Sequence, residues 1–255
     1  MELNPCMKHH LVRKTVREFA EDCLRPIAAE SDHQARFPKE VIEKMRPLNY
    51  FGLQAPPEYG GAGLDTISYA IAIEEISRVS AGVGLCITVH NSVALHPVLK
   101  FGSDEQKKRW AAALATGERI GAFCLTEANA GSDAGGVETI ALLQDGGYVI
   151  NGTKIFVSNG AVCSLALIFA KTDPDDPRRG SSVLAVEKER EGFIVGEIED
   201  LSGMRCNPVS SLFMEDCKVP KENLLGRPGD GLKIGLATLD TGRGGQIDRF
   251  YPARR

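Results

Sequence analysis

The sequence has no surplus of charge of either sign and lacks the motifs of several common enzyme classes. Its 255 residues include 30 Lys and Arg against 34 Asp and Glu, a formal net charge of -4. Without a basic surplus to neutralise phosphates, nucleic acid is not expected as a partner. The G-x-S-x-G, P-loop and G-x-G-x-x-G patterns are also missing. Their absence excludes the commonest serine hydrolases, P-loop NTPases and dinucleotide-binding folds.

The sequence also lacks a long uninterrupted apolar run. Its most hydrophobic stretch, Ala81–Leu99, is interrupted by polar residues and a proline: His90, Asn91, Ser92, His96 and Pro97. We therefore expect buried helices here rather than a membrane span. The N-terminus, Met1–His10, has neither the apolar segment nor the small-residue cleavage site of an export signal. These features predict a cytoplasmic protein with no membrane contact.

Disulfide and metal-binding patterns are missing as well. The seven cysteines are widely spaced and include no C-x-x-C pair: Cys6, Cys23, Cys86, Cys124, Cys163, Cys206 and Cys217. We expect reduced thiols, most of them buried. The five histidines form no H-E-x-x-H or Cys/His pattern, so no metal site is predicted.

The first part of the chain, residues 1–120, has the apolar spacing of helices. Helical stripes are predicted at Leu11–Leu24 with a stop at Pro26, after Pro38, at Tyr69–Val79, and at Glu105–Leu114 with Asp104 as N-cap. Between them, Ala55–Leu64 contains two prolines and three glycines, which favours a loop. An all-α N-terminal domain is therefore expected.

From Gly121 to residue 228 the pattern changes to short runs of β-branched and aromatic residues. Two turn signals, Asp145-Gly146-Gly147 and Asn151-Gly152, predict tight hairpins. Further strands are predicted at Leu165–Lys171, Ser182–Val186, Phe193–Glu197 and Ser211–Glu215. Because no helices separate these strands, we expect an antiparallel, barrel-like middle domain rather than a parallel sheet. The predicted fold class is α+β.

The end of the chain is predicted in two parts. Helical spacing returns at Asp230–Leu239, so residues 229–243 are expected to begin a third, helical segment. Residues 244–255 contain two glycines and a proline with no amphipathic period. This composition predicts an irregular tail.

A polar, glycine-rich loop, Phe123–Gly136, is the densest candidate for a ligand site. Gly131 would let backbone N–H groups approach a ligand, while Thr126 and Ser132 offer hydroxyls. The alternative is a long interdomain loop in which Asp133 only caps a turn. Composition alone favours this alternative.

A second candidate is the segment Lys154–Gly160. Strand alternation would place Phe156 and Ser158 on one face, and an aromatic face beside a hydroxyl suits a planar heteroaromatic ligand. The alternative is a core Phe156 and a surface Ser158 ahead of an Asn-Gly turn.

Five segments taken together resemble the acyl-CoA dehydrogenase family. They are EYGGAGLD (Glu58–Asp65), AIAIEEISRVSAGVG (Ala70–Gly84), FCLTEANAGSDAGG (Phe123–Gly136), INGTKIFVSNG (Ile150–Gly160) and MEDCKVPKENLLG (Met214–Gly226). Their order and spacing fit the family from about Val12 to Arg243, closest to its short-chain, butyryl-CoA-type members. The resemblance implies a helical domain, a middle β domain and a C-terminal four-helix domain. This chain resembles the first two and lacks the third.

The resemblance also implies residue roles. FAD, the family's cofactor, would be bound by Phe123, Leu125, Thr126, Gly131, Ser132, Phe156, Val157 and Ser158. The acyl-CoA substrate would be bound by Ser132, Asp240 and Arg243. The family usually has Trp in place of Phe156, and stacking on the flavin should survive that change. It commonly has Pro in place of Ala128, so we expect a slightly looser loop.

The reaction implied by the resemblance is α,β-desaturation of an acyl-CoA. A carboxylate removes the α-proton, a hydride passes to flavin N5, and electrons leave through electron-transferring flavoprotein. Most members carry that base in the C-terminal domain and a minority at the position of Gly242, which has no carboxylate, so no catalytic residue is assigned.

We therefore expect a truncated, impaired short-chain acyl-CoA dehydrogenase. The alternative is a non-catalytic flavin- or acyl-CoA-binding fragment, or a subunit completed by another chain. The family forms homo-oligomers, and this property stays open here.

Overall fold

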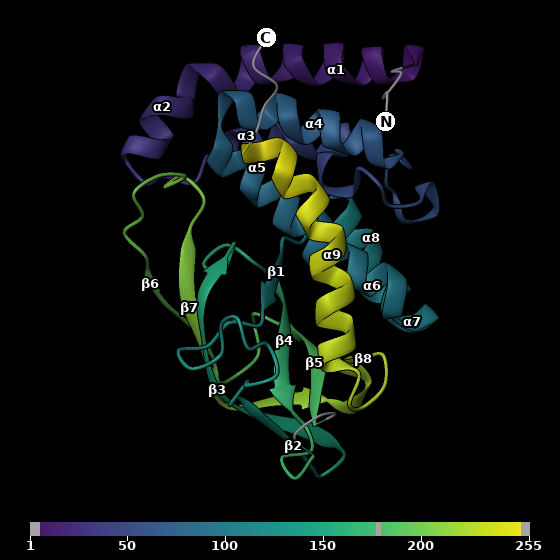
Figure 1. The fold of residues 1–255 in the computed structure, drawn as a ribbon, viewed down its shortest axis with the longest axis vertical. Helices are drawn as coiled ribbons and strands as arrows, with labels where there is room; N and C mark the ends of the chain where they lie inside the picture. The colour runs from purple at the N-terminus through teal and green to yellow at the C-terminus, as the bar shows by residue number, and fades with distance from the viewer. Residues whose placement is uncertain (1–5, 177–179, 251–255) are drawn as a thin grey trace.

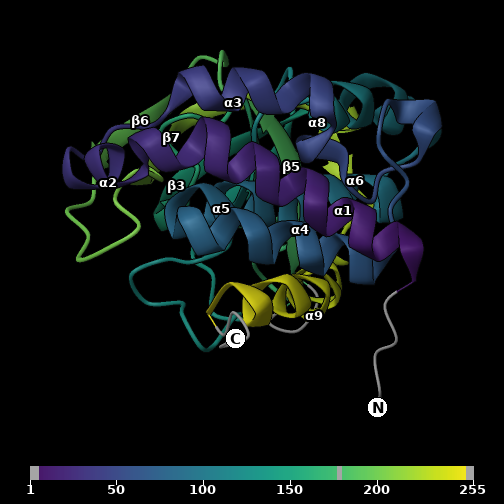
Figure 2. The ribbon, with the colours of Figure 1, turned by 90° about the horizontal axis from the view of Figure 1, so that it is seen from above.

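The computed structural model describes residues 6–176 and 180–250. A helical part lies at one end and a sheet at the other (Figure 1). The last helix, α9 (Gly231–Phe250), runs from the sheet along the helical part. Seen from above, α9 lies beside α4 (Thr66–Val79) and α5 (Ala81–Thr88) (Figure 2). The predicted α+β class is confirmed.

The N-terminal helix continues across Pro26, where the sequence predicted a stop. α1 (Met7–Phe19) passes into a π-helical turn, Ala20–Leu24, and then into α2 (Arg25–His33). Pro26 therefore occupies the first turn of α2. The helix tolerates it there because a first-turn nitrogen needs no partner within its own helix.

Six further α-helices belong to the described helical part. They are α3 (Lys39–Met45), α4, α5, α6 (His96–Phe101), α7 (Asp104–Gln106) and α8 (Ala112–Ala115), with π-helical turns at Val89–Leu95 and Lys107–Ala111. The N-cap of α7 is Ser103 rather than the predicted Asp104. The Ser103 hydroxyl accepts from the N–H of Gln106, and the Gln106 side chain bonds back to the Ser103 N–H. This reciprocal capping box outcompetes a cap at Asp104.

One continuous helix, Ala81–Phe101, lies in the middle of the helical part. By length and hydropathy it would pass as a membrane span, although its polar residues predicted otherwise. Of its most apolar window, 89% is buried inside the molecule. The burial is typical of a core helix, as expected from the sequence.

Eight strands form one mainly antiparallel sheet in the described residues. They are β1 (Gly121–Cys124), β2 (Ile140–Gln144), β3 (Gly147–Ser158), β4 (Leu165–Lys171), β5 (Ser181–Glu187), β6 (Phe193–Ile198), β7 (Val209–Pro220) and β8 (Leu224–Leu225). The order is β6-β7-β3-β2-β4-β5-β8, and β1 pairs in parallel with β4. The predicted hairpin at Asp145-Gly146 joins β2 to β3, with both residues at positive φ.

The hairpin predicted at Asn151-Gly152 is wrong, because both residues lie inside strand β3. Pairing with β7 shifts register between Ile150 and Gly152, which marks an irregularity in the ladder. A Cβ built at Gly152 would lie 2.5 Å from the Thr139 hydroxyl oxygen, so glycine permits this close approach. The Asn151 side chain exchanges hydrogen bonds with Asp216 across the strands instead of turning the chain.

The irregular tail predicted from residue 244 is also wrong up to residue 250. Helix α9 continues through Phe250, and residues 251–255 lie outside the described part. Once the first turns of a helix have formed, each further residue that is fixed adds one hydrogen bond. Gly244 and Gly245 are poor helix formers, but propagation from the preceding turns carries α9 through them.

Buried His90 joins the helical part to the first strand. Its Nδ1 accepts from the backbone N–H of Gly121 at 3.0 Å, so Nε2 carries the proton and donates to the Leu114 carbonyl oxygen at 2.9 Å. The ring lies edge-on to Phe51, with centroids 5.0 Å apart. Burial lowers the pKa of His90 to about 4, so the imidazole is neutral near pH 7.

We expect the free energy of unfolding to fall as the pH drops from 6.5 to about 4. In this window the unfolded chain protonates its histidine while folded His90 stays neutral. Protons therefore favour the unfolded state, by up to roughly 3 kcal/mol. Urea denaturation of the wild type and His90→Gln between about pH 7.5 and pH 5 measures the effect. A slope as steep in His90→Gln as in the wild type would contradict the assignment.

Candidate functional site

The loop between β1 and β2 lies against strand β3. The backbone N–H of Ile155 donates to the carbonyl oxygen of Thr126 at 3.0 Å. A bridge between Glu127 and Ala130 folds the loop back on itself. Figure 1 shows this loop in teal beside β3. The structure therefore brings together the two segments that the sequence analysis proposed separately.

A buried ion pair fixes this arrangement. Lys154 is fully buried and Glu127 is 5% exposed, with Lys154 Nζ 2.5 Å from Glu127 Oε1. The same carboxylate accepts from the N–H groups of Glu138 and Thr139, near the far end of the loop. One side chain thus holds the loop at both ends.

Both pKa values of the pair are shifted. Burial raises the pKa of Glu127, but the Lys154 ammonium and the two N–H groups outweigh it and leave that pKa below its ordinary value. Burial lowers the pKa of Lys154, while the Glu127 carboxylate opposes the shift. Each group therefore makes burial of the other's charge possible.

Strand β3 bulges where it meets the loop. It is in register with β7 at Lys154 and again at Val157, with one more residue between these positions on β3 than on β7. Phe156 lies in this bulge at φ 54, in the left-handed region, and is 62% exposed. A bulky residue that is both exposed and held in a strained backbone conformation indicates a functional position.

The bulge changes the predicted facing of side chains. The extra residue lies between Lys154 and Val157, so fully buried Lys154 and exposed Phe156 do not share a face. Val157 is buried in the sheet core, so only its backbone remains available to a ligand. Ser158 is half-buried beside it. Phe156 is therefore exposed because it lies in the bulge, and not because of the regular alternation of side chains along a strand.

The first residues of the loop pack inward. The Phe123 ring lies 4.8 Å from that of Phe169, measured between centroids, and borders a small apolar cluster of Leu85, Val89 and Val93. Leu125 lies in a seam with the first turns of α9, lined also by Val137, Phe169, Leu232 and Leu236. These contacts surround the inner side of the loop with apolar groups.

The tip of the loop is open. A Cβ built at Gly131 would meet no atom within 4 Å, and Ser132 is exposed. Asp133 accepts from the N–H of Gly135 at 3.1 Å, so it caps a turn as the alternative interpretation predicted. The Asp133 turn cap does not exclude a ligand site, because the exposed positions Gly131 and Ser132 precede the capped turn.

Two of the three predicted substrate residues, Asp240 and Arg243, lie on α9, and the third, Ser132, lies at the tip of the loop. Asp240 is exposed, and the side chain of Arg243 lies outside the described part of the chain. Gly242 is buried, and a Cβ there would lie 2.9 Å from Val93 Cγ1. A carboxylate side chain at position 242 would therefore require a shift of the neighbouring turn.

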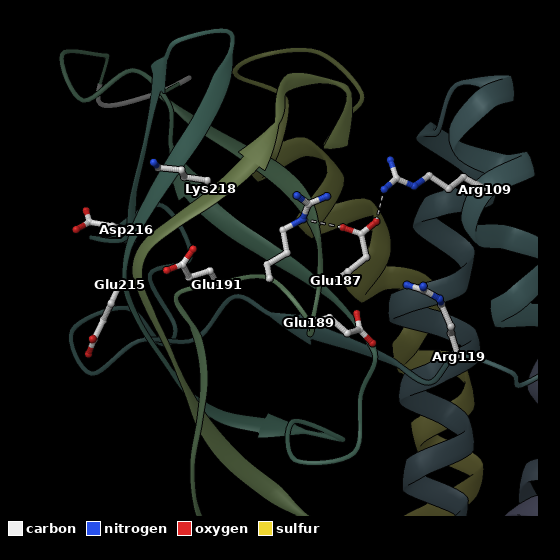
Figure 3. Close-up of a pocket in the computed structure, with 9 residues that line it drawn as sticks. Arg109, Arg119, Glu187, Glu189, Glu191, Glu215, Asp216 and Lys218 are labelled. Atoms are coloured by element: carbon white, nitrogen blue, oxygen red, sulfur yellow. Dashed lines mark hydrogen bonds and ion pairs between the residues drawn. The ribbon is translucent and has the colours of Figure 1, made fainter.

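A charged cleft of about 670 Å³ lies between the helical part and the sheet, away from the loop and the bulge (Figure 3). Its walls carry both signs of charge, from Arg109, Arg119, Glu187, Glu189, Arg190, Glu191, Glu215, Asp216 and Lys218. The buried Glu187 carboxylate accepts from Arg109 at 2.7 Å and from Arg190 at 3.1 Å. Trp110 donates to it as well. We interpret this cleft as an ion-pair network that joins the two parts.

Among the side chains that the structure describes, within residues 6–176 and 180–240, no three His, Cys, Asp or Glu are grouped so that they could hold a metal ion.

Family comparisons match both parts of the molecule. A sequence model of the acyl-CoA dehydrogenase N-terminal domain matches residues 7–118, and one of the middle domain matches residues 122–217. The chain belongs to the acyl-CoA dehydrogenase family. Because the two models meet between α8 and β1, the family boundary coincides with the change from helices to sheet.

Individual relatives agree with this assignment. The short-chain specific acyl-CoA dehydrogenase of Clostridium acetobutylicum is 44% identical over 243 residues, which cover 95% of this chain and 64% of the relative. Butyryl-CoA dehydrogenase from Megasphaera elsdenii superposes with a TM-score of 0.94 at 36% identity, covering 98% of this chain and 66% of that one. An acyl-CoA dehydrogenase complexed with FAD from Bacillus anthracis gives 0.89 at 33% identity, with 96% and 43% covered. This chain thus spans less than two thirds of the relatives it matches.

Sequence reasoning missed the Glu127–Lys154 pair. The two residues are 27 positions apart, on a loop and a strand, so neither period nor motif links them. The available signal was strand alternation, which places Lys154 on the same face as Tyr148 and Ile150, where an unpaired charge would be costly.

We expect Phe156→Asn to raise the free energy of unfolding of the ligand-free protein by about 0.5–1 kcal/mol. Asn adopts the left-handed conformation at lower cost than Phe, and an exposed ring contributes little burial. Thermal and urea denaturation measure the change. A loss of stability greater than about 1 kcal/mol would show that the ring is a core element.

Proposed function

We propose that this chain binds FAD between the loop Phe123–Ser132 and the bulge Phe156–Ser158, as the flavin-binding part of an acyl-CoA dehydrogenase. The observation that carries the proposal is Phe156, an exposed ring in a strained bulge beside an open glycine-rich loop. The relative from Bacillus anthracis that carries FAD has the same fold over 96% of this chain.

The residues present fit a flavin. Gly131 leaves a space that any side chain would fill, and the hydroxyls of Thr126, Ser132 and Ser158 can donate to ring oxygens and nitrogens. Phe156 offers an aromatic face for the ring system. Backbone N–H groups of the loop tip can approach phosphate oxygens because Gly131 lacks a Cβ.

When bound, flavin supplies the acceptor for a hydride from the substrate. The chain's own contribution is to hold and shield the reacting groups. Phe123 and Leu125 line the inner side of the loop with apolar surface, which keeps water away. Phe156 and Ser158 orient a planar group from the strand side. We assign no catalytic base to this chain, because the position that serves in a minority of the family is Gly242.

The substrate that we propose for the acyl-CoA dehydrogenase of which this chain is the flavin-binding part is a short-chain acyl-CoA, desaturated between its α and β carbons. Support comes from 44% identity to a relative named as short-chain specific. Ser132, Asp240 and Arg243 are the proposed contacts with acyl-CoA, the Arg as partner of a phosphate. Electron-transferring flavoprotein is the proposed acceptor and a homo-oligomer the proposed assembly.

We also propose a cytoplasmic location. It is supported by seven cysteines that are all free, five of them buried. A reducing compartment keeps such thiols unpaired.

We expect purified chain to bind FAD and Phe156→Ala to weaken that binding about tenfold, because one aromatic stack is lost. Gly131→Val should weaken it at least as much by filling the open space, while leaving the ligand-free stability within about 0.5 kcal/mol. Quenching of flavin fluorescence gives the dissociation constants. Equal affinity in all three proteins would refute a site at this position.

With FAD bound, we expect butyryl-CoA to leave the flavin absorbance unchanged under anaerobic conditions, since no base is assigned. The visible spectrum before and after substrate addition tests this. Bleaching of the flavin would show that the chain supplies a base of its own. Bleaching by butyryl-CoA would also exclude the alternative that the chain is a non-catalytic binding fragment.

A further inference from the structure

One buried carboxylate, that of Glu127, bonds to Lys154 on β3 and to the N–H groups of Glu138 and Thr139 at the far end of the loop. We propose that the Glu127–Lys154 pair is a positioning device, which sets the glycine-rich loop at a fixed distance from the bulge that carries Phe156. The proposal rests on the proposed function, because the affinity it controls is that for FAD. It assigns a role to two residues that neither touch the open space at Gly131 nor belong to the predicted contact set.

The contacts show how the device works. Lys154 Nζ donates to Glu127 Oε1 at 2.5 Å and to the Leu125 carbonyl oxygen at 3.3 Å, so it holds the start of the loop. Glu127 accepts from the N–H of Glu138 at 2.5 Å and from that of Thr139 at 3.1 Å, so it holds the end. The residues between, 128–137, include the open tip at Gly131 and can shift only if these bonds break.

Lys154 connects the loop to the bulge. It is the last residue of β3 in register with β7, opposite Leu212, before the extra residue that displaces Phe156. The next residue, Ile155, donates its N–H to the Thr126 carbonyl oxygen. The ion pair at Lys154 and the backbone bond at Ile155 therefore fix the loop to the two residues that directly precede Phe156.

Stability alone does not account for this pair. Bringing two charges out of water costs several kcal/mol each, and a buried ion pair is often no more stabilising than apolar residues of similar volume. A directional pair with three backbone partners, Leu125, Glu138 and Thr139, instead selects one loop conformation. Replacement of the Glu127–Lys154 pair by neutral residues of similar shape should therefore preserve the fold but no longer fix the position of the loop relative to the bulge.

The first test measures FAD affinity in three variants. We expect Lys154→Met and Glu127→Gln each to raise the dissociation constant at least tenfold, with lower thermal stability. In the double variant Glu127→Gln/Lys154→Met, no charge is left unpaired, so thermal stability should return toward that of the wild type while the dissociation constant stays raised. If affinity returns together with stability, the pair is only a packing element and the proposal fails.

Glu187→Gln is the matched control. Glu187 is also a buried carboxylate with several donors, but it lies in the charged cleft beside Arg109 (Figure 3). It also accepts hydrogen bonds from Trp110 and Arg190. We expect this variant to lose stability and keep its FAD dissociation constant within twofold. A tenfold loss of affinity in Glu187→Gln would show that any buried-charge defect weakens the site, and would overturn a specific role for the pair.

The second test uses the protein without FAD. In Lys154→Met we expect amide exchange at Glu138 and Thr139 to speed up at least tenfold, with the amides of β4 unchanged. Unchanged exchange at both amides would refute positioning whatever the affinity. Failure of the wild type to bind FAD would overturn the proposed function alone, since the exchange experiment still decides whether the pair holds the loop.

Discussion

An extra residue in strand β3 is the constraint on which the candidate site depends. Between Lys154 and Val157 the bulge exposes Phe156 at a positive φ that a regular strand would not allow. An aromatic ring held outward in this way costs conformational energy and leaves apolar surface in water. That cost is understandable if the ring meets a planar ligand. The loop placed beside it by Glu127 supplies the open space for one.

The rest of the molecule keeps these two segments in place. His90 bonds the helical part to the start of β1, from which the loop leaves. Glu187 joins Arg109 and Trp110, in the π-helical turn Lys107–Ala111, to the end of β5, at a separate place along the same boundary. Leu125 packs against the first turns of α9, so this helix contacts the loop as well. The helical part and the sheet thus meet through buried, hydrogen-bonded side chains with few alternative arrangements.

The hydrophobic pattern predicted an element correctly where short-range interactions determine its structure. Leu165–Lys171 was predicted to the residue, because a buried strand between turn signals has a strong and short-range pattern. Pro26 and Asn151-Gly152 were misread, since a π-helical turn and a strand irregularity accommodate them through distant partners. The loop and Phe156 were found as candidates, but their strained geometry and the Glu127–Lys154 pair arise from tertiary contacts that no window of sequence contains. Family resemblance supplied the cofactor, which the residues alone suggested only as a planar ligand.

The most direct test of this account is amide hydrogen exchange of the chain with and without saturating FAD. The account predicts slower exchange in two segments, residues 125–132 and 155–158, with no change at the charged cleft around Glu187. Protection of that cleft, or of neither segment while FAD is bound, would contradict it. In either case the flavin would be held by surfaces other than the loop and the bulge.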